Sequence, residues 1–385
     1  MKFEFATAGR IVFGTGTLRQ IGGAARGLGR KALVMTGANP KRAEGLIEAL
    51  TAEGIAATAF PVTHEPTVAT VAAGSELARS KACDLIIGLG GGSAIDAAKA
   101  VAALVTNPGD VLEYLEVIGQ ARPLAVPAAP CIAIPTTAGT GAEVTRNAVL
   151  ASPEHKVKAS LRNHSMLPRI AWIDPALTLD LPPALTASTG LDALTQLIEP
   201  YVSCRANPLT DGLCLEGLRR AAGSLKTAVH DGGNVKARED MSIASLFSGL
   251  ALANAGLGAV HGFAAVIGGM FRAPHGAVCA ALLAPATSTN VRAIRERRPD
   301  DGETLQRYAT VAQTLTQDPR AGIEEGIAWI RELVAELRIP RLADYGITAG
   351  DLPEISDKAA HASSMKANPL PLTSIERLEI LQLAL

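Results

Sequence analysis

The chain has 385 residues, of which 48% are hydrophobic and 19% charged, and its 36 lysines and arginines nearly balance its 37 aspartates and glutamates. This length exceeds one ordinary hydrophobic core, so two domains are expected. The apolar content excludes intrinsic disorder, and a formal net charge of −1 offers no basic face for nucleic acid.

The first part of the chain alternates β-rich runs with helical stretches. Apolar runs bounded by Gly or Pro and separated by helices are typical of βαβ units with a parallel sheet. The expected strands are 31–37, 55–62, 83–90 and 131–135, and the expected helices are 42–50, 67–80 and 93–104.

The pattern changes near residues 174–183, beyond which nearly everything predicts helix. The clearest helices are 191–201, 213–227, 237–253 and 304–316. We therefore expect an α/β N-terminal domain at 1–181 and an all-α C-terminal domain at 182–385.

The stretch from Met241 to Phe271 contains no Asp, Glu, Lys or Arg and is long enough to cross a bilayer. It also carries serines, Asn254, His261 and several glycines, and no second span accompanies it. We interpret it as buried helices of a protein with no membrane partner.

A glycine-rich turn joins the expected strand 83–90 to the next helix. Gly90, Gly91 and Gly92 allow close approach of a ligand and positive φ, Ser93 is expected to cap the helix, and the helix N-terminus favours an anion. The spacing matches neither GxGxxG nor a P-loop. We favour phosphate binding over a tight turn alone.

A second polar loop follows the strand 131–135. It contains the four threonines Thr136, Thr137, Thr140 and Thr145 and two glycines, at the edge where α/β sheets bind ligands. The loop suits ribose and pyrophosphate contacts, although it is equally compatible with an ordinary connection.

Four polar side chains suggest a metal site. Asp192 and Gln196 are four residues apart in a helical pattern and share one face, while His261 and His275 lie in a glycine-rich, apolar region. A carboxylate, two imidazoles and an amide oxygen could bind Fe²⁺ or Zn²⁺. Alone, His261 fits a core histidine better, and His275, before Gly276, is expected on a loop.

Six motifs stand in the order found in one family: GGGSAIDAAKA (90–100), PTTAGTGAEVT (135–145), WIDPALTLDLP (172–182), TGLDALTQLIE (189–199), NAGLGAVHGFA (254–264) and PHGAV (274–278). The chain thereby resembles the iron-containing (group III) alcohol dehydrogenases along nearly its whole length. The resemblance implies a Rossmann-like domain and a helical domain, the architecture shared with dehydroquinate synthases, with the active site in the cleft between them. The implied reaction is hydride transfer between NAD(P)H and an aldehyde or ketone.

By motif position, the resemblance also implies a dinucleotide site. Its residues would be Gly90, Gly91, Gly92, Ser93, Asp96, Thr136, Thr137, Thr140, Thr145 and Lys158, with Gly37 and Asn39 near the adenosine ribose. NAD-preferring members carry an acidic residue where Gly37 stands. Because Lys41 and Arg42 follow, we expect NADP(H) to be favoured over NAD(H).

The metal set departs from the family, whose ligands are one Asp and three His. These positions hold Asp192, Gln196, His261 and His275, and a further family histidine is replaced by Ala265. Either Gln196 Oε1 completes a metal site, or the protein works without metal, as maleylacetate-reductase-like relatives do on anionic keto acids. Asp192, His261 and His275 are the expected catalytic residues; without a metal, His261, His275 or a nearby lysine would donate hydrogen bonds to the developing charge.

The substrate pocket is expected to include Asn147 and Leu252. Leu252 stands where many relatives have a bulky aromatic residue, which predicts a small-molecule substrate larger than ethanol. A dehydroquinate-synthase-like lyase and a catalytically silent NADP-binding protein are the alternatives. Five scattered cysteines without a CxxC pair and a first segment without a signal peptide predict the cytoplasm, and relatives suggest a homodimer or larger oligomer.

Overall fold

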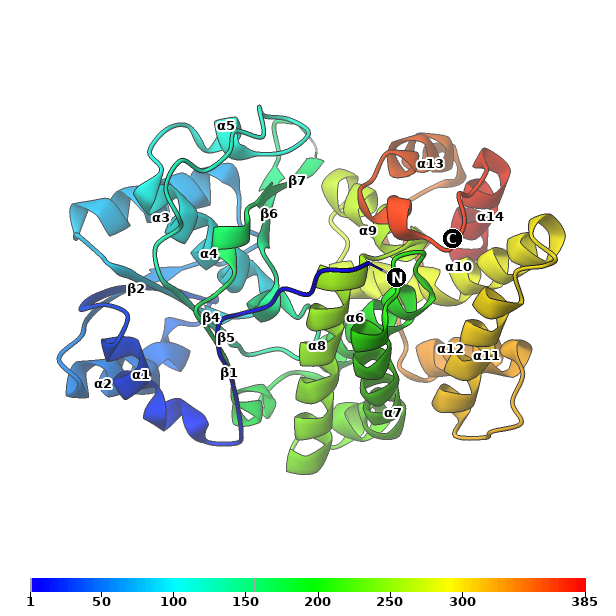
Figure 1. Cartoon of the computed structure of the whole chain (residues 1–385), viewed down its shortest axis with the longest axis horizontal. Helices are drawn as coiled ribbons and strands as arrows, with labels where there is room; N and C mark the ends of the chain where they lie inside the picture. The colour runs from blue at the N-terminus through cyan, green and yellow to red at the C-terminus, as the bar shows by residue number, and fades with distance from the viewer. Residues whose placement is uncertain (1, 156) are drawn as a thin grey trace. The chain divides into compact units, whose positions relative to one another are not determined.

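The computed structural model describes residues 2–155 and 157–385, and they form two compact units (Figure 1). One unit is Ala6–Thr137 with Gly141–Leu179, and the other is Asp180–Leu385 with Ala138–Thr140 and residues 2–5. The chain thus leaves the first unit shortly before the boundary predicted at residues 181 and 182. The prediction also placed Ala138–Thr140 in the first domain, whereas this segment packs with the helical unit, where Gly139 approaches Thr189.

The first unit is built on a six-stranded parallel sheet. Its strands lie in the order β1-β8-β5-β4-β2-β3. Their bounds are β1 (Ile11–Phe13), β2 (Lys31–Thr36), β3 (Ala56–Pro61), β4 (Leu85–Gly90), β5 (Cys131–Pro135) and β8 (Ile170–Ile173). A separate antiparallel pair joins β6 (Asn147–Ser152) to β7 (Val157–Arg162). The predicted α/β class is confirmed, although β1, β6, β7 and β8 were not predicted.

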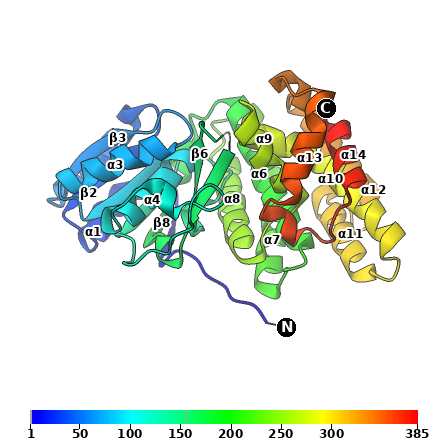
Figure 2. The same ribbon diagram turned by 90° about the horizontal axis from the view of Figure 1, so that it is seen from above.

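Helices cover both faces of this sheet (Figure 1). They are α1 (Ile21–Arg26), α2 (Glu44–Ala52), α3 (Val68–Ser80), α4 (Gly92–Thr106) and the short α5 (Val111–Tyr114). Alternate residues of β2 point to opposite faces: Ala32 and Val34 pack with α1 and α2, whereas Leu33 and Met35 pack with α3 and α4. Figure 2 shows α3 and α4 side by side over their face.

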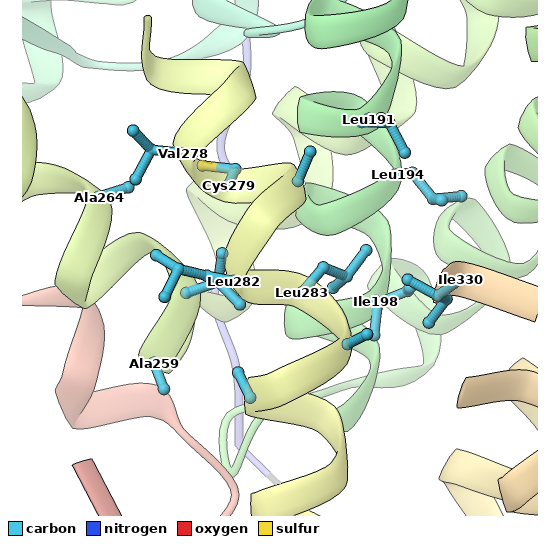
Figure 3. Close-up of a cluster of buried hydrophobic side chains, with 14 of the residues drawn as sticks. Leu191, Leu194, Ile198, Ala259, Ala264, Val278, Cys279, Leu282, Leu283 and Ile330 are labelled. Atoms are coloured by element: carbon cyan, nitrogen blue, oxygen red, sulfur yellow. The ribbon is translucent and has the colours of Figure 1, made fainter. Parts of the chain in front are cut away.

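The second unit is helical. Its helices are α6 (Pro183–Val202), α7 (Pro208–His230), α8 (Val235–Ala255), α9 (Ala259–Met270), α10 (His275–Arg297), α11 (Gly302–Thr316), α12 (Ile323–Glu336), α13 (Leu352–Ala360) and α14 (Ser374–Ala384). α6 lies at the centre, and every residue from Gly190 to Val202 is buried. Figure 3 shows Leu191 and Leu194 of α6 in one cluster with Leu282 and Leu283 of α10. The predicted helical domain is therefore confirmed.

The uncharged stretch Met241–Phe271 forms the end of α8 and all of α9, which meet at 99°. Most of its residues are buried, as predicted. α10 is long and apolar enough to span a membrane by length and composition, and 78% of its apolar window is buried inside the protein. This burial is what a core helix of a packed domain shows.

Close packing of α4 on β4 leads to a first prediction. A Cβ added at Gly88 would lie 2.9 Å from Ala98 Cβ and 3.1 Å from Ile95 Cα. Gly88→Ala should therefore destabilise the protein by about 1–3 kcal/mol, the usual effect of overpacking. Urea unfolding curves measure the change.

The matched control is Gly23→Ala in α1, where an added Cβ meets nothing within 4 Å. That variant should gain about 0.5–1 kcal/mol because alanine favours helix over glycine. Equal stability of Gly88→Ala and the parent would contradict the packing argument.

Candidate active site and metal centre

One face of α6 carries a row of polar side chains through the apolar helical core. Asp192, Gln196 and Glu199 follow each other at intervals of four and three residues, which aligns them on one side of the helix. Their exposures are 2%, 4% and 6%. Buried polar groups of this kind need partners, so the surrounding helices must supply them.

Two histidines converge on Asp192. His261 lies in the first turn of α9 and His275 is the first residue of α10, and their Nε2 atoms lie 3.4 and 3.7 Å from Asp192 Oδ1. The structure therefore brings together three of the four predicted metal-site residues. The prediction that His275 sits on a loop is wrong, because Pro274 caps α10 and the helix begins at His275.

A fourth group, Cys279, joins this cluster and was missed by the sequence analysis. It lies one turn beyond His275 on α10, and its Sγ is 3.6 Å from His275 Nε2 and 3.8 Å from His261 Nε2. One ligand atom from each of Asp192, His261, His275 and Cys279 lies within 4.8 Å of the others. The available signal was the four-residue spacing from His275, which places two residues on one helix face.

Glu199 fixes the orientation of His261. Its Oε2 lies 2.6 Å from His261 Nδ1, and its Oε1 accepts a 2.7 Å hydrogen bond from the Val260 N–H. Gly258 makes room for this carboxylate, since a Cβ there would lie 2.9 Å from Glu199 Oε1. The carboxylate favours a proton on Nδ1, so Nε2, which faces Asp192, is the nitrogen that would bind a metal, the arrangement typical of metal-binding histidines.

The charges of the cluster reinforce one another. Burial raises the pKa of Asp192. The nearby His275 and His261 lower that pKa by a larger amount, so it lies below the usual value for an aspartate. Burial lowers the pKa of His261, and Cys279, Glu199 and Asp192 raise it to well above the usual value. His275 follows the same pattern, raised by Cys279 and Asp192 against burial. The acidic groups and the two imidazoles of this cluster therefore favour one another's charged forms.

The cluster fits a divalent cation. Asp192 Oδ1 is buried and has no hydrogen-bond partner among the described residues. A carboxylate oxygen, two imidazole nitrogens and a thiol sulfur are the donors that first-row metals prefer. An ion at this point would supply the interaction that Asp192 Oδ1 otherwise lacks.

Gln196 is held by the protein around it. One end of its amide lies 3.2 Å from the carbonyl oxygens of both Gly139 and Thr140 and 2.9 Å from Ser248 Oγ. Because carbonyl oxygens only accept hydrogen bonds, we assign this end as the NH₂ group. Three acceptors therefore surround the NH₂ group, which cannot bind a metal. Any role of Gln196 as a ligand falls to Oε1, on the other side of the amide.

The glycine turn in the α/β unit has the predicted place but a different local geometry. α4 begins at Gly92 and is capped by Gly91, so Ser93 is not the cap. Gly90, Gly91 and Gly92 all lack a positive φ. The need for glycine is instead close packing, because a Cβ at Gly90 would lie 2.7 Å from Ala94 Cβ. The helix N-terminus still meets the end of β4, as a phosphate site requires.

Several predicted cofactor residues are engaged within the α/β unit. Asp96 pairs with the fully buried Lys99 at 2.9 Å and accepts a hydrogen bond from the Val149 N–H. Lys99 also donates to Thr145 Oγ1 at 2.9 Å. These contacts hold the polar loop and β6 against α4. Asp96 and Thr145 therefore support the loop through contacts within the protein.

The other predicted cofactor residues are spread over two loops. The Thr136 N–H donates to the Gly90 carbonyl, and Thr137 lies against Gly91, which joins the polar loop to the glycine turn. Thr140 belongs to the helical unit. Lys158 forms a 2.6 Å ion pair with Glu65, and Asn39 accepts a hydrogen bond from the Lys41 N–H at the start of a 3-10 helix.

The two predicted pocket residues lie in different units. Asn147 begins β6 and pairs with Arg162 of β7, and it is half-buried. Leu252 is half-buried near the end of α8. Their joint role in a pocket stays a prediction.

Comparison with known proteins identifies the family. Residues 8–175 match the model of the iron-containing alcohol dehydrogenases, and residues 186–385 match the C-terminal model of the same family. A 1,3-propanediol dehydrogenase of Klebsiella pneumoniae is 35% identical over 95% of both chains. The chain belongs to the iron-containing alcohol dehydrogenase family.

Solved structures agree with this assignment. A 1,3-propanediol oxidoreductase superposes with a TM-score of 0.93 at 32% identity over the whole of both chains. A sulfoacetaldehyde reductase of Bifidobacterium kashiwanohense, solved with NAD⁺, superposes with a TM-score of 0.87 at 26% identity, covering 100% of this chain and 99% of that one. The resemblance inferred from the motifs is thus confirmed.

The activity follows from the family. This iron-containing alcohol dehydrogenase is an NAD(P)-dependent oxidoreductase that interconverts an alcohol with an aldehyde or ketone. The family implies a nicotinamide cofactor and a divalent metal, and the Asp192 cluster is the candidate metal site. The relatives are dehydrogenases and a reductase, which favours hydride transfer over the lyase alternative.

The contact between Glu199 and His261 yields a second prediction. In Glu199→Gln the amide would donate to Nδ1, which moves the imidazole proton to Nε2, the atom that faces Asp192. Affinity for a divalent metal should fall about 10–100-fold. Competition with a chromogenic chelator measures it.

Glu216→Gln on α7 is the control, because it removes a carboxylate of the same unit that pairs with Arg219 and Arg220. Its metal affinity should equal that of the parent. An unchanged affinity in Glu199→Gln would show that Glu199 does not orient His261 for metal binding.

Proposed function

We propose that this dehydrogenase reduces carbonyl compounds bulkier than acetaldehyde with NADP(H), assisted by Fe²⁺ or Zn²⁺ at Asp192, His261 and His275. The supporting observation is the convergence of both Nε2 atoms on the buried Asp192 Oδ1, which has no hydrogen-bond partner among the described residues. Gln196 Oε1 is the predicted fourth contact.

Each residue has a defined task in this proposal. Asp192 supplies charge, Glu199 and its hydrogen bond hold His261, and His275, whose side chain is 35% exposed, lies at the open side of the cluster. A divalent cation held by these residues would supply Lewis-acid polarisation of the substrate oxygen, and a bound nicotinamide would supply the hydride chemistry. Ala265 cannot carry a proton, so no relay runs through that position.

The glycine turn supports dinucleotide binding. The backbone of Gly90 and Gly91 lies at the end of β4, where the start of α4 presents N–H groups to a pyrophosphate. Thr136 and Thr137 border the same turn. An added Cβ at Gly37 meets nothing within 4 Å, which leaves room beside the exposed Lys41 and Arg42 for a 2′-phosphate.

A metal-independent mode is the second candidate. It is favoured by the amide of Gln196, whose nitrogen is committed to the protein where the family has a histidine ligand. His261 and His275 would then stabilise the developing negative charge by hydrogen bonds, with an anionic keto acid as substrate. This is the mode of maleylacetate-reductase-like relatives.

Location and assembly complete the proposal. The five free cysteines support the reducing cytoplasm. β1 is an edge strand with Ile11 exposed, and such an edge can pair with a second copy, which supports a homodimer or larger oligomer. Light scattering after gel filtration measures the oligomeric state.

Anaerobic reconstitution tests the metal-assisted mode. After loading with Fe²⁺ or Zn²⁺ and desalting, the protein should retain close to one metal per chain and reduce bulky aldehydes with NADPH. Chelation should abolish both properties. Asp192→Asn should lose them too, whereas Asp240→Asn, a buried carboxylate paired with Arg220, should keep them.

The opposite outcomes are distinct. Full activity without metal supports the metal-independent mode. Tight NADPH binding without metal or turnover on a broad carbonyl panel supports the catalytically silent protein. If acetaldehyde is turned over faster than every bulkier aldehyde in the panel, the proposal of a bulky substrate is contradicted.

Gly37→Asp tests the cofactor preference. The carboxylate fits into open space and would repel a 2′-phosphate while accepting hydrogen bonds from a ribose. The ratio of kcat/KM for NADPH over NADH should fall about tenfold or more. Gly23→Asp, also in open space but on α1, should leave the ratio unchanged. A parent that prefers NADH would refute the NADP(H) assignment.

A further inference from the structure

We propose that Cys279 binds the metal as a thiolate and replaces the histidine that the family has at position 196, giving an Asp–His–His–Cys site that favours Zn²⁺ over Fe²⁺. The inference rests on the proposed metal-assisted function and assigns the fourth ligand of that site differently. The family pattern of one Asp and three His contains no cysteine.

The spacing of the donor atoms supports this assignment. In a tetrahedral zinc site with N, O and S ligands at their usual distances, neighbouring donor atoms lie about 3.3–3.6 Å apart. Here Cys279 Sγ is 3.6 Å from His275 Nε2 and 3.8 Å from His261 Nε2. Asp192 Oδ1 is 3.4 and 3.7 Å from the same two nitrogens. Four of the six edges of a tetrahedron are therefore near their bonded lengths without any ion.

Burial adds a second argument. Cys279 is fully buried, Asp192 Oδ1 is buried with no hydrogen-bond partner among the described residues, and both belong to the same cluster of donor atoms. Figure 3 shows Cys279 on α10 among the apolar side chains of the core, beside Val278. Its Sγ nevertheless lies within 4 Å of two imidazole nitrogens.

The contacts of Gln196 explain the exchange. With its NH₂ group assigned to the carbonyls of Gly139 and Thr140 and to Ser248 Oγ, Gln196 can offer only Oε1, so Asp192 is the α6 side chain whose donor atom lies in the cluster. α10 contributes His275 and Cys279, one turn apart. Thiolate is a soft ligand that zinc accepts readily, whereas a set of imidazoles and carboxylate also suits iron.

Cobalt substitution tests the proposal without relying on activity. The protein loaded with Co²⁺ should show a near-ultraviolet thiolate-to-cobalt charge-transfer band, and Cys279→Ser should lose that band. Zinc affinity of Cys279→Ser should fall by about 100-fold or more, beyond the loss expected from an outer contact. Cys214→Ala, a buried cysteine on α7, is the matched control and should keep both the band and the affinity.

A rescue variant guards against misfolding. Cys279→Ser combined with Gln196→His restores the family's ligand set, so it should regain metal affinity but not the charge-transfer band. Gln196→Leu alone should leave the band in place. In metal competition, the parent should retain Zn²⁺ over Fe²⁺, and the rescued double variant should lose part of that preference.

The failures of the two proposals differ. A parent that binds one Co²⁺ per chain without the band, with unchanged affinity in Cys279→Ser, overturns the role of Cys279 and leaves metal-assisted function standing. If Gln196→Leu loses the metal instead, the fourth ligand is Gln196 Oε1. That result would also overturn the role of Cys279. A parent that binds no metal yet turns over overturns both.

Discussion

Burial of two carboxylates inside an apolar helical core is the constraint on which the catalytic half of the molecule depends. Removing an unpaired carboxylate from water costs more than a packed core can offset, so Asp192 and Glu199 must each find a partner. His261 serves both, and the other elements are arranged around it. A Cβ at Gly276 would lie 2.3 Å from the Ser188 carbonyl, which shows how closely α10 must approach α6 to bring His275 to Asp192.

In the α/β unit, the position of the glycine turn depends on close backbone packing and not on paired charges. The end of β4 and the start of α4 approach so closely that a side chain at Gly88 or Gly90 would collide with α4. Lys99, fully buried on the same helix, ties the polar loop to α4 through Thr145 and the Ala142 carbonyl. Within the α/β unit, Thr136 is therefore tied to the glycine turn and Ala142 and Thr145 to the buried Lys99 of α4.

Sequence patterns predicted the central strands β4 and β5 but missed β6 and the short strand β8, although β8 is as fully buried as β4. β4 and β5 are buried at every residue, so their apolar runs were visible, whereas β6 alternates and lies in a two-stranded pair outside the main sheet. Motif position correctly grouped Asp192 with both histidines. It could not place Cys279, because a single cysteine carries no spacing signal until His275 is known to begin a helix.

The position of His275 also decides how the family pattern should be applied to this chain. A comparison with the family motif treats each position separately. It therefore shows that Gln196 has replaced a ligand, but it does not show that another residue could supply a new one. In three dimensions α6 and α10 face the same small space, and a ligand removed from one helix can be supplied by the other. Cys279 is fully buried and within 4 Å of both imidazoles, so the donor count of the cluster stays at four. What the exchange alters is chemistry, because sulfur takes the place of nitrogen and changes which metal the same fold prefers.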